Sequence, residues 1–171
     1  DLEGIQLWLN LPAKDKMMTP NYQHLEDEQI PKVYSDDKKV QLNIVAGHQN
    51  GKEGLITTQT SVNVFTANAD EGGQLEIEIP ENHQSLIYLL DGEILVNSTE
   101  VLKKGENQMV TFHQDGNTIK FEAKSASTLL ILSGAPIKEK VTQYGPYVMN
   151  TQTEILEAMR DYQQGKMGYL Y

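Results

Sequence analysis

The side chains of this sequence that could bind a metal ion include four histidines, His24, His48, His83 and His113. Two histidines reach the same ion when they are two residues apart on a strand or four apart on a helix, because both side chains then share a face. No pair of histidines in this chain has either spacing. Since each lies in or beside a polar or turn-like segment, we expect four solvated loop histidines. A metal role for His83 or His113 is the alternative.

Other catalytic chemistries lack their usual sequence patterns. There is no G-x-S-x-G motif, no glycine-rich phosphate loop and no pair of strand carboxylates at a suitable spacing. The glycine pair at residues 72–73 and the glycines around His48 are more simply explained as turns. The sequence therefore predicts no catalytic, cofactor-binding or metal-binding residue.

Composition limits the class of protein further. A chain of 171 residues is long enough for one well-packed domain. The absence of cysteine excludes disulfides and thiolate metal sites, and it fits a reducing compartment such as the cytoplasm. A net charge of -10 without any local Lys/Arg cluster disfavours direct binding to nucleic acid or to anionic membranes. No apolar run approaches the roughly 18 residues that span a bilayer.

The most apolar stretch of the chain is centred on Asp91-Gly92. Residues 86–90 and 93–96 are both apolar runs, and an Asp-Gly pair between two such runs is typical of a tight type I′ turn. We therefore expect these two runs to pair as a hairpin in the centre of a β core.

Alternating or apolar runs predict further short strands on both sides of this stretch. Residues 4–11 alternate between apolar and polar, which predicts a strand with one buried face, ended by Pro12. Residues 13–39 are polar and predict a surface connection with a short strand near Val33. The remaining predicted strands are residues 40–44, 62–65, 75–79, 101–102, 109–112, 119–121 and 129–132, with a turn at Asn50-Gly51. Roughly ten short strands separated by turn signals favour an all-β antiparallel sandwich or barrel.

One helix is predicted near the end of the chain. Thr151 and Glu154 have the spacing of a capping box. Apolar residues then follow at helical spacing, and Gly165 is a suitable C-terminal stop. These residues are Ile155, Ala158, Met159 and Tyr162.

Three stretches carry a resemblance to a known family. The runs Y-G-P-Y-V-M-N-T-Q-T-E-I at residues 144–155 and A-M-R-D-Y-Q-Q-G-K-M-G at residues 158–168 resemble the closing signature of the pirin family of cupin proteins. The opening I-Q-L-W-L-N-L-P-A-K-D-K-M at residues 5–17 is similar to the segment that joins the two cupin domains of pirins, and Y-L-L-D-G-E at residues 88–93 resembles a cupin first motif. The resemblance covers only the second half of a pirin.

The resemblance implies a cupin-type, jelly-roll-like fold and a place to look for metal ligands. Pirins resemble two stacked cupin barrels, of which the first holds an iron-type metal through three histidines and a glutamate. Counted back from Tyr88, the first two ligand positions fall on Glu78 and Pro80 here, and the acidic position falls on Gln84. No histidine lies near residues 117–121, where a further ligand is expected. Glu78 and Gln84 could line a barrel pocket, although a solvent-facing glutamate is the simpler interpretation.

These observations lead to one expected domain organisation. Residues 1–143 are expected to form the cupin barrel, including the opening strand, and residues 144–171 a strap and helix that pack on it. Because the chain begins at Asp1 in strand-like sequence, we expect that a preceding metal-binding cupin domain, with iron or another divalent metal, is missing.

The expected function is that of a metal-free C-terminal cupin domain with a structural or interaction role. Its partner would be the missing domain, and apolar surface left uncovered at residues 4–11 and on the helix could also cause homo-oligomerisation. Two alternatives stay open. One is an enzyme: either a small cupin oxygenase or isomerase whose metal ligands are other residues of this chain, or a quercetin dioxygenase-like activity that belongs to the full-length parent. The other is a carbohydrate or small-molecule binding barrel. Some pirins are also reported as nuclear transcriptional cofactors, a role that the acidic composition does not support.

Overall fold

The computed structural model describes residues 4–168, and its contacts divide the chain into two compact units. The first, here called the β unit, comprises residues 21–136. The second, here called the terminal unit, combines residues 4–20 with residues 137–168. This grouping differs from the expected division at residue 143, which placed the opening residues in the barrel. The two units are described one after the other.

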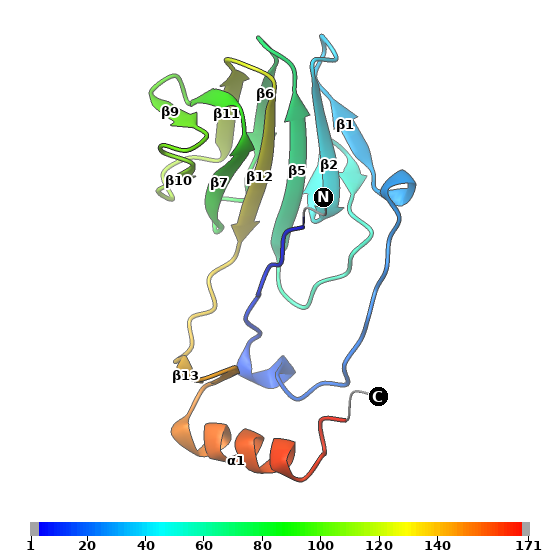
Figure 1. The fold of residues 1–171 in the computed structure, drawn as a ribbon, viewed down its shortest axis with the longest axis vertical. Helices are drawn as coiled ribbons and strands as arrows, with labels where there is room; N and C mark the ends of the chain where they lie inside the picture. Colours follow the sequence, from blue (N-terminus) through cyan, green and yellow to red (C-terminus); the bar gives the residue numbers. More distant parts are fainter. Residues whose placement is uncertain (1–3, 169–171) are drawn as a thin grey trace. The chain divides into compact units, whose positions relative to one another are not determined.

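The larger sheet of the β unit has six antiparallel strands in the order β1-β2-β5-β12-β7-β10. Figure 1 shows β12, β5 and β2 of this sheet side by side. The strands are β1 (Lys32–Tyr34), β2 (Val40–Ala46), β5 (Val62–Ala69), β7 (Gln84–Asp91), β10 (Met109–Thr111) and β12 (Ser127–Gly134). A short 3-10 helix, Asp27–Gln29, precedes the first of them.

The smaller sheet has four antiparallel strands in the order β6-β11-β8-β9. They are β6 (Gln74–Glu78), β8 (Glu93–Val96), β9 (Glu100–Lys103) and β11 (Thr118–Ala123). A separate hairpin joins β3 (His48–Gln49) to β4 (Lys52–Glu53) through Asn50 and Gly51, whose φ angles are 48° and 73°. The predicted turn at Asn50-Gly51 is confirmed, because both central residues have the positive φ that a type I′ turn requires.

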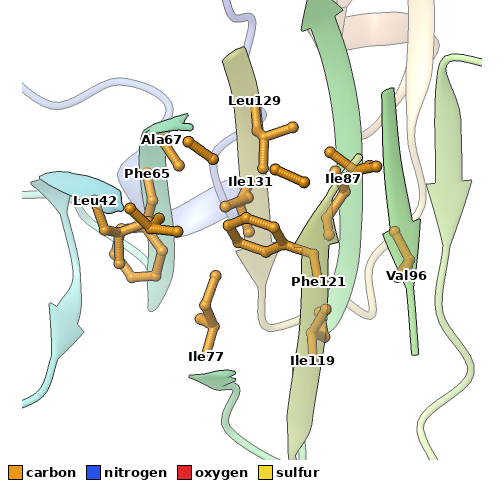
Figure 2. Packing of buried hydrophobic residues seen from close by; sticks show 14 of the residues in the cluster. Leu42, Phe65, Ala67, Ile77, Ile87, Val96, Ile119, Phe121, Leu129 and Ile131 are labelled. Atoms are coloured by element: carbon orange, nitrogen blue, oxygen red, sulfur yellow. The ribbon is translucent and has the colours of Figure 1, made fainter. Parts of the chain in front are cut away.

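Both sheets turn their apolar side chains toward a shared interior. Phe121 of β11 points toward Ile131 of β12 in Figure 2, and Ile77 of β6 lies in the same cluster. Within residues 4–168 the two sheets form separate ladders, so the architecture is a sandwich rather than a closed barrel. The all-β antiparallel fold class is confirmed.

The predicted central hairpin is wrong. β7 pairs with β12 and β10, whereas β8 pairs with β11 and β9, so the chain crosses from one sheet to the other at Asp91-Gly92. Gly92 has a φ of +89°, and a Cβ there would overlap Ala126 and Ser127. The Ser127 hydroxyl accepts a hydrogen bond from the Glu93 backbone N–H at 3.1 Å, which fixes the corner. An Asp-Gly pair between apolar runs therefore marks a sheet-to-sheet corner here.

The predicted strand at residues 4–11 is also wrong. This opening segment forms no strand, and Ile5, Leu7 and Leu9 are 49%, 46% and 57% exposed. Alternation of side chains does not make a strand without a neighbouring chain to accept and donate its backbone hydrogen bonds. The segment ends in a short 3-10 helix, Ala13–Asp15, after Pro12.

The rest of the terminal unit is a hairpin followed by the predicted helix. β13 (Thr142–Tyr144) pairs with β14 (Tyr147–Met149), and α1 (Gln152–Gln163) packs against both strands. The capping box is confirmed: the Glu154 backbone N–H donates to Thr151 Oγ1 at 3.3 Å, and the Thr151 backbone N–H donates to Glu154 Oε2 at 2.7 Å. Of the predicted stripe, Ile155 is fully buried, whereas Tyr162 is 62% exposed.

Hydrogen bonds attach the opening residues to this hairpin. The Ala13 backbone N–H and the Asn150 side-chain amide both donate to Glu139 Oε2, at 2.7 and 3.0 Å. Lys16 Nζ donates to the Val148 carbonyl oxygen at 3.3 Å. These bonds explain why residues from both ends of the sequence share one unit.

The corner at Gly92 gives a testable prediction. Gly92→Ala should lower the free energy of unfolding by about 3 kcal/mol or more, because the new methyl group meets both strain at positive φ and the backbone of Ala126. Gly105→Ala is the matched control, since Gly105 has a φ of +81° but nothing within 4 Å of an added Cβ. The control should lose only about 1 kcal/mol. Urea unfolding measures the stability of both variants. Equal losses of stability would contradict the close approach of Ala126 to Gly92 at the corner.

Candidate functional site

At one end of the β unit, polar side chains face the otherwise apolar interior. Asn63 of β5 pairs with Ser133 of β12, which pairs with Ser85 of β7. These three residues, here called the polar row, alternate along their strands with residues that face the opposite side. Phe65, Ile131 and Ile87 are fully buried and lie two residues from Asn63, Ser133 and Ser85, toward the middle of the same strands. The polar row therefore faces the same interior as these apolar residues. The polar row lies where the strands reach the end of the sandwich.

His83 is hydrogen-bonded to this row and is only 4% exposed. Its Nδ1 lies 3.0 Å from Ser133 Oγ, and its Nε2 lies 2.9 Å from Ser61 Oγ. Asn63 Nδ2 donates to Ser133 Oγ at 2.9 Å, and Asn63 Oδ1 accepts from the His48 backbone N–H at 3.2 Å. The network joins β5, β12 and the turns before β3 and β7.

The network favours the neutral form of His83. In the tautomer with its proton on Nε2, Ser133 accepts from Asn63 and donates to Nδ1, while Nε2 donates to Ser61, so every proton has an acceptor. With a second ring proton on Nδ1, Ser133 Oγ would have to accept from both Nδ1 and Asn63, and its own proton would lose Nδ1 as an acceptor. Burial also lowers the pKa of His83 below its ordinary value of 6.5, because desolvation disfavours the imidazolium ion.

A pocket of about 370 Å³ opens beside His83 and Ser85. It is here called the mouth pocket, and its walls come from both sheets: Ile79 and Ile119 from the side of the smaller sheet, and Ser85 and Val110 from the larger. His113 lies at the same pocket and is exposed.

A second pocket, of about 730 Å³, lies on the other side of Ile79 and Thr118, which line both. Its lining is mostly polar and includes Ser61, Glu78 and Gln49. Gln49 is 2% exposed, and its amide is placed to donate to the Glu78 carbonyl oxygen and to accept from the Glu78 backbone N–H, both at 3.2 Å. This side chain therefore substitutes for a neighbouring strand at the end of β6 and holds the β3–β4 hairpin against it.

The expected ligand positions do not face the interior. Glu78, Pro80 and Gln84 are all exposed, and Ile77 and Ile79, which alternate with Glu78 and Pro80, are the buried residues. The ligand positions that were counted back from Tyr88 therefore fall on the outward-facing residues of this stretch, one residue away from the inward-facing ones. Glu78 is exposed, as the simpler interpretation expects, and it also lines the pocket of about 730 Å³. In this stretch Ile79 and Ser85 line the mouth pocket instead.

The donor set at the inward face does not suit a divalent metal ion. Ile79 offers no ligand atom, the Ser85 hydroxyl is a weak one, and both ring nitrogens of His83 already have serine partners. Over residues 4–168, no group of three or more His, Asp or Glu side chains is placed to hold an ion. His24, His48 and His113 are exposed as expected, but His83 is buried, so the expectation of four solvated histidines is wrong for that residue.

Comparison with protein families identifies the fold. Residues 64–168 match the family model for the pirin C-terminal cupin domain. This chain belongs to the pirin family. It is 34% identical to a pirin-like protein from Solanum lycopersicum, over 98% of this chain, and 34% identical to a putative quercetin 2,3-dioxygenase from Pseudomonas aeruginosa, over 96% of it. The chain spans 57% of the length of each of these two relatives.

A solved structure has the same fold. A crystal structure of quercetin 2,3-dioxygenase from Acinetobacter baumannii superposes with a TM-score of 0.89 at 32% sequence identity. The match covers 96% of this chain and 56% of that chain. The cupin-type fold predicted from the sequence is thereby confirmed.

Among the residues that the structure describes, no helix is both long enough and apolar enough to cross a bilayer.

Sequence reasoning missed the polar row although a signal for it existed. Asn63 precedes Phe65 and Ala67 at a spacing of two, and Ser133 follows Leu129 and Ile131 at the same spacing, so each polar residue extends an apolar face. What the sequence lacked was the register between β5, β12 and β7, which depends on the tertiary fold.

The network around His83 predicts a specific loss of stability in weak acid. Because the unfolded chain titrates at the ordinary value near 6.5 and the folded pKa is lower, the unfolded state binds more protons between the two values. Stability should therefore be complete above about pH 6.5 and fall below it, with a slope of at most about 1.4 kcal/mol per pH unit. Urea unfolding at a series of pH values measures it.

Two histidine variants isolate this effect. His83→Gln should flatten the slope that begins below about pH 6.5, whatever the stability of the variant itself. His113→Gln, which changes an exposed imidazole, should keep it. The carboxyl pKa values of Asp37, Asp91 and Glu154 are lowered from 3.8, 3.8 and 4.5, first of all by side-chain hydrogen bonds, so their contributions disappear only at lower pH. A slope retained in His83→Gln would contradict the proposed origin.

Proposed function

We propose that this chain is a non-catalytic C-terminal cupin domain of a pirin, with a structural or interaction role. The observation that supports this most strongly is the identity of the inward-facing residues at the end of the sandwich. Ile79, Ser85 and His83 fill the place where a metal-binding cupin needs several free imidazole and carboxylate ligands. A metal centre built from these three residues would lack enough ligand atoms to hold the ion that an oxygenase needs.

Oxygenase activity is proposed instead for a longer protein that contains this domain. Two relatives from Pseudomonas aeruginosa are each named a putative quercetin 2,3-dioxygenase. Both are longer than this chain, which spans 57% of the length of one and 59% of the length of the other. We propose that the metal, iron or another divalent ion, is held in their additional part, and that the present domain packs against it. Because the sequence has no cysteine, we propose a reducing compartment, the cytoplasm, for this role.

The interaction role is supported by the opening segment, residues 4–11, in the terminal unit. Trp8 is 78% exposed, and Ile5, Leu7 and Leu9 are each close to half exposed. A groove of about 510 Å³ lies between this segment and the β13–β14 hairpin, lined by Trp8, Leu11 and Met149 among others. Contiguous exposed apolar side chains of this size are typical of a surface that another part of a protein covers.

Activity measurements test the non-catalytic role. The chain, incubated separately with Fe²⁺, Mn²⁺, Ni²⁺ and Cu²⁺, should consume no oxygen with quercetin beyond the rate of the free metal ion. A full-length relative such as the putative dioxygenase from Pseudomonas aeruginosa serves as the comparison. Turnover by this chain above the metal-only rate, with any of the four ions, would reject the proposal.

Sedimentation measurements test the interaction surface. The uncovered opening segment should cause self-association at high protein concentration, and Trp8→Ser with Leu9→Ser should weaken it, because both side chains are exposed apolar groups. Tyr22→Ser is the control, since Tyr22 is 83% exposed but lies in the other unit. A clean monomer of the unmodified chain at high concentration would contradict this part of the proposal.

A further inference from the structure

We propose that the mouth pocket of the β unit binds a small neutral ring molecule that carries hydroxyl groups. The pocket lies at the open end of the sandwich and has a volume of about 370 Å³. That volume is at the lower end of the range of ligand pockets, roughly 300–1,000 Å³, and suits a single substituted ring.

The floor of the pocket is apolar. Ile79, Val96 and Ile119 are 6%, 1% and 3% exposed and line the pocket together with Val110 from the facing sheet. Branched aliphatic side chains on two opposing walls leave a slot that an apolar ring face can fill. Of these four side chains, the half-buried Val110 keeps the most accessible aliphatic surface for such a ring to cover.

Three residues of the pocket lining carry hydroxyl groups with no internal partner. Ser85 is half-buried on the inward face of β7, whereas Thr111 and Thr118 are exposed and alternate with the inward-facing Val110 and Ile119. None of these three hydroxyls makes a hydrogen bond to another of the residues 4–168, whereas the neighbouring Ser61 and Ser133 are both used by His83. Free hydroxyls both donate and accept, which is the chemistry that recognises hydroxyl groups on a ligand.

The charges at the pocket favour a neutral ligand over an anion. Glu100 and Asp115 line the pocket, and neither Lys nor Arg is among its lining residues. Burial disfavours the charged form of His83, and both of its ring nitrogens are hydrogen-bonded to serines rather than free for an anion. A carboxylate or phosphate ligand would be repelled by the two carboxylates, and no lysine or arginine of the lining would offset that repulsion.

Nuclear magnetic resonance titration of the isotope-labelled chain tests this site without any enzyme assay. The probes are catechol and methyl glucoside, which carry hydroxyls on an aromatic and on a saccharide ring, and benzoate, which matches catechol in size but is an anion. Saturable shifts of Ser85, Val96 and Val110 with catechol or methyl glucoside, but not with benzoate, would support the site and tell the two ring types apart. The proposal fails if neither neutral probe gives saturable shifts, or if benzoate binds equally well.

Two variants of adjacent residues separate filling of the pocket from general effects. Ser85→Ile places a branched side chain into the pocket and should weaken binding about tenfold or more. Gln84→Ile adds the same side chain on the opposite, exposed face of β7 and should leave binding unchanged. Val110→Phe enlarges an inward-facing side chain that lines the pocket and serves if Ser85→Ile does not fold. Binding that survives both pocket variants would overturn the proposal, and this result is independent of whether the chain binds metal.

Discussion

The arrangement of this domain depends on one constraint: two separate sheets must bury their apolar faces against each other. Phe121 and Ile77 from the smaller sheet meet Ile131 and Phe65 from the larger in that shared interior. Because side chains alternate along a strand, the constraint fixes which residues face inward all the way to the open end of the sandwich. The site follows from this: the strands that bury phenylalanine and isoleucine in the middle present Asn63, Ser133 and Ser85 at the end.

Hydrogen bonding explains why this end is stable with polar groups inside. A buried imidazole without partners would be costly, but His83 uses both nitrogens on serine hydroxyls, and Asn63 completes the chain. The same bonds leave His83 without a lone pair for an ion. The network therefore ties the ends of the strands together, and it supports the non-catalytic role proposed above for this domain.

Local patterns predicted much of this fold, and tertiary relations account for the errors. The turn at Asn50-Gly51 and the capping box of Thr151 depend on neighbouring residues alone, and both were predicted correctly. The corner at Gly92 was mistaken for a hairpin because the same dipeptide serves both, and the choice depends on which sheet receives β8. The opening segment has the alternation of a strand, but the structure describes no neighbouring strand for it. For the site, the sequence alone did not show which residues of the strand face inward, so it could not tell that Glu78 is exposed and Ile79 buried. It also did not show that His83 is buried.

The central proposal is that the aliphatic, hydroxyl and hydrogen-bonded groups of the inward face at the end of the sandwich do not form a ligand set for a metal ion. The most direct test is the metal content of the chain after it is saturated with Fe²⁺, Mn²⁺, Ni²⁺ or Cu²⁺ and dialysed, measured by inductively coupled plasma mass spectrometry. The account predicts far less than one ion per chain for every metal. One tightly held ion per chain, lost when Ser85 or His83 is replaced by alanine, would contradict it.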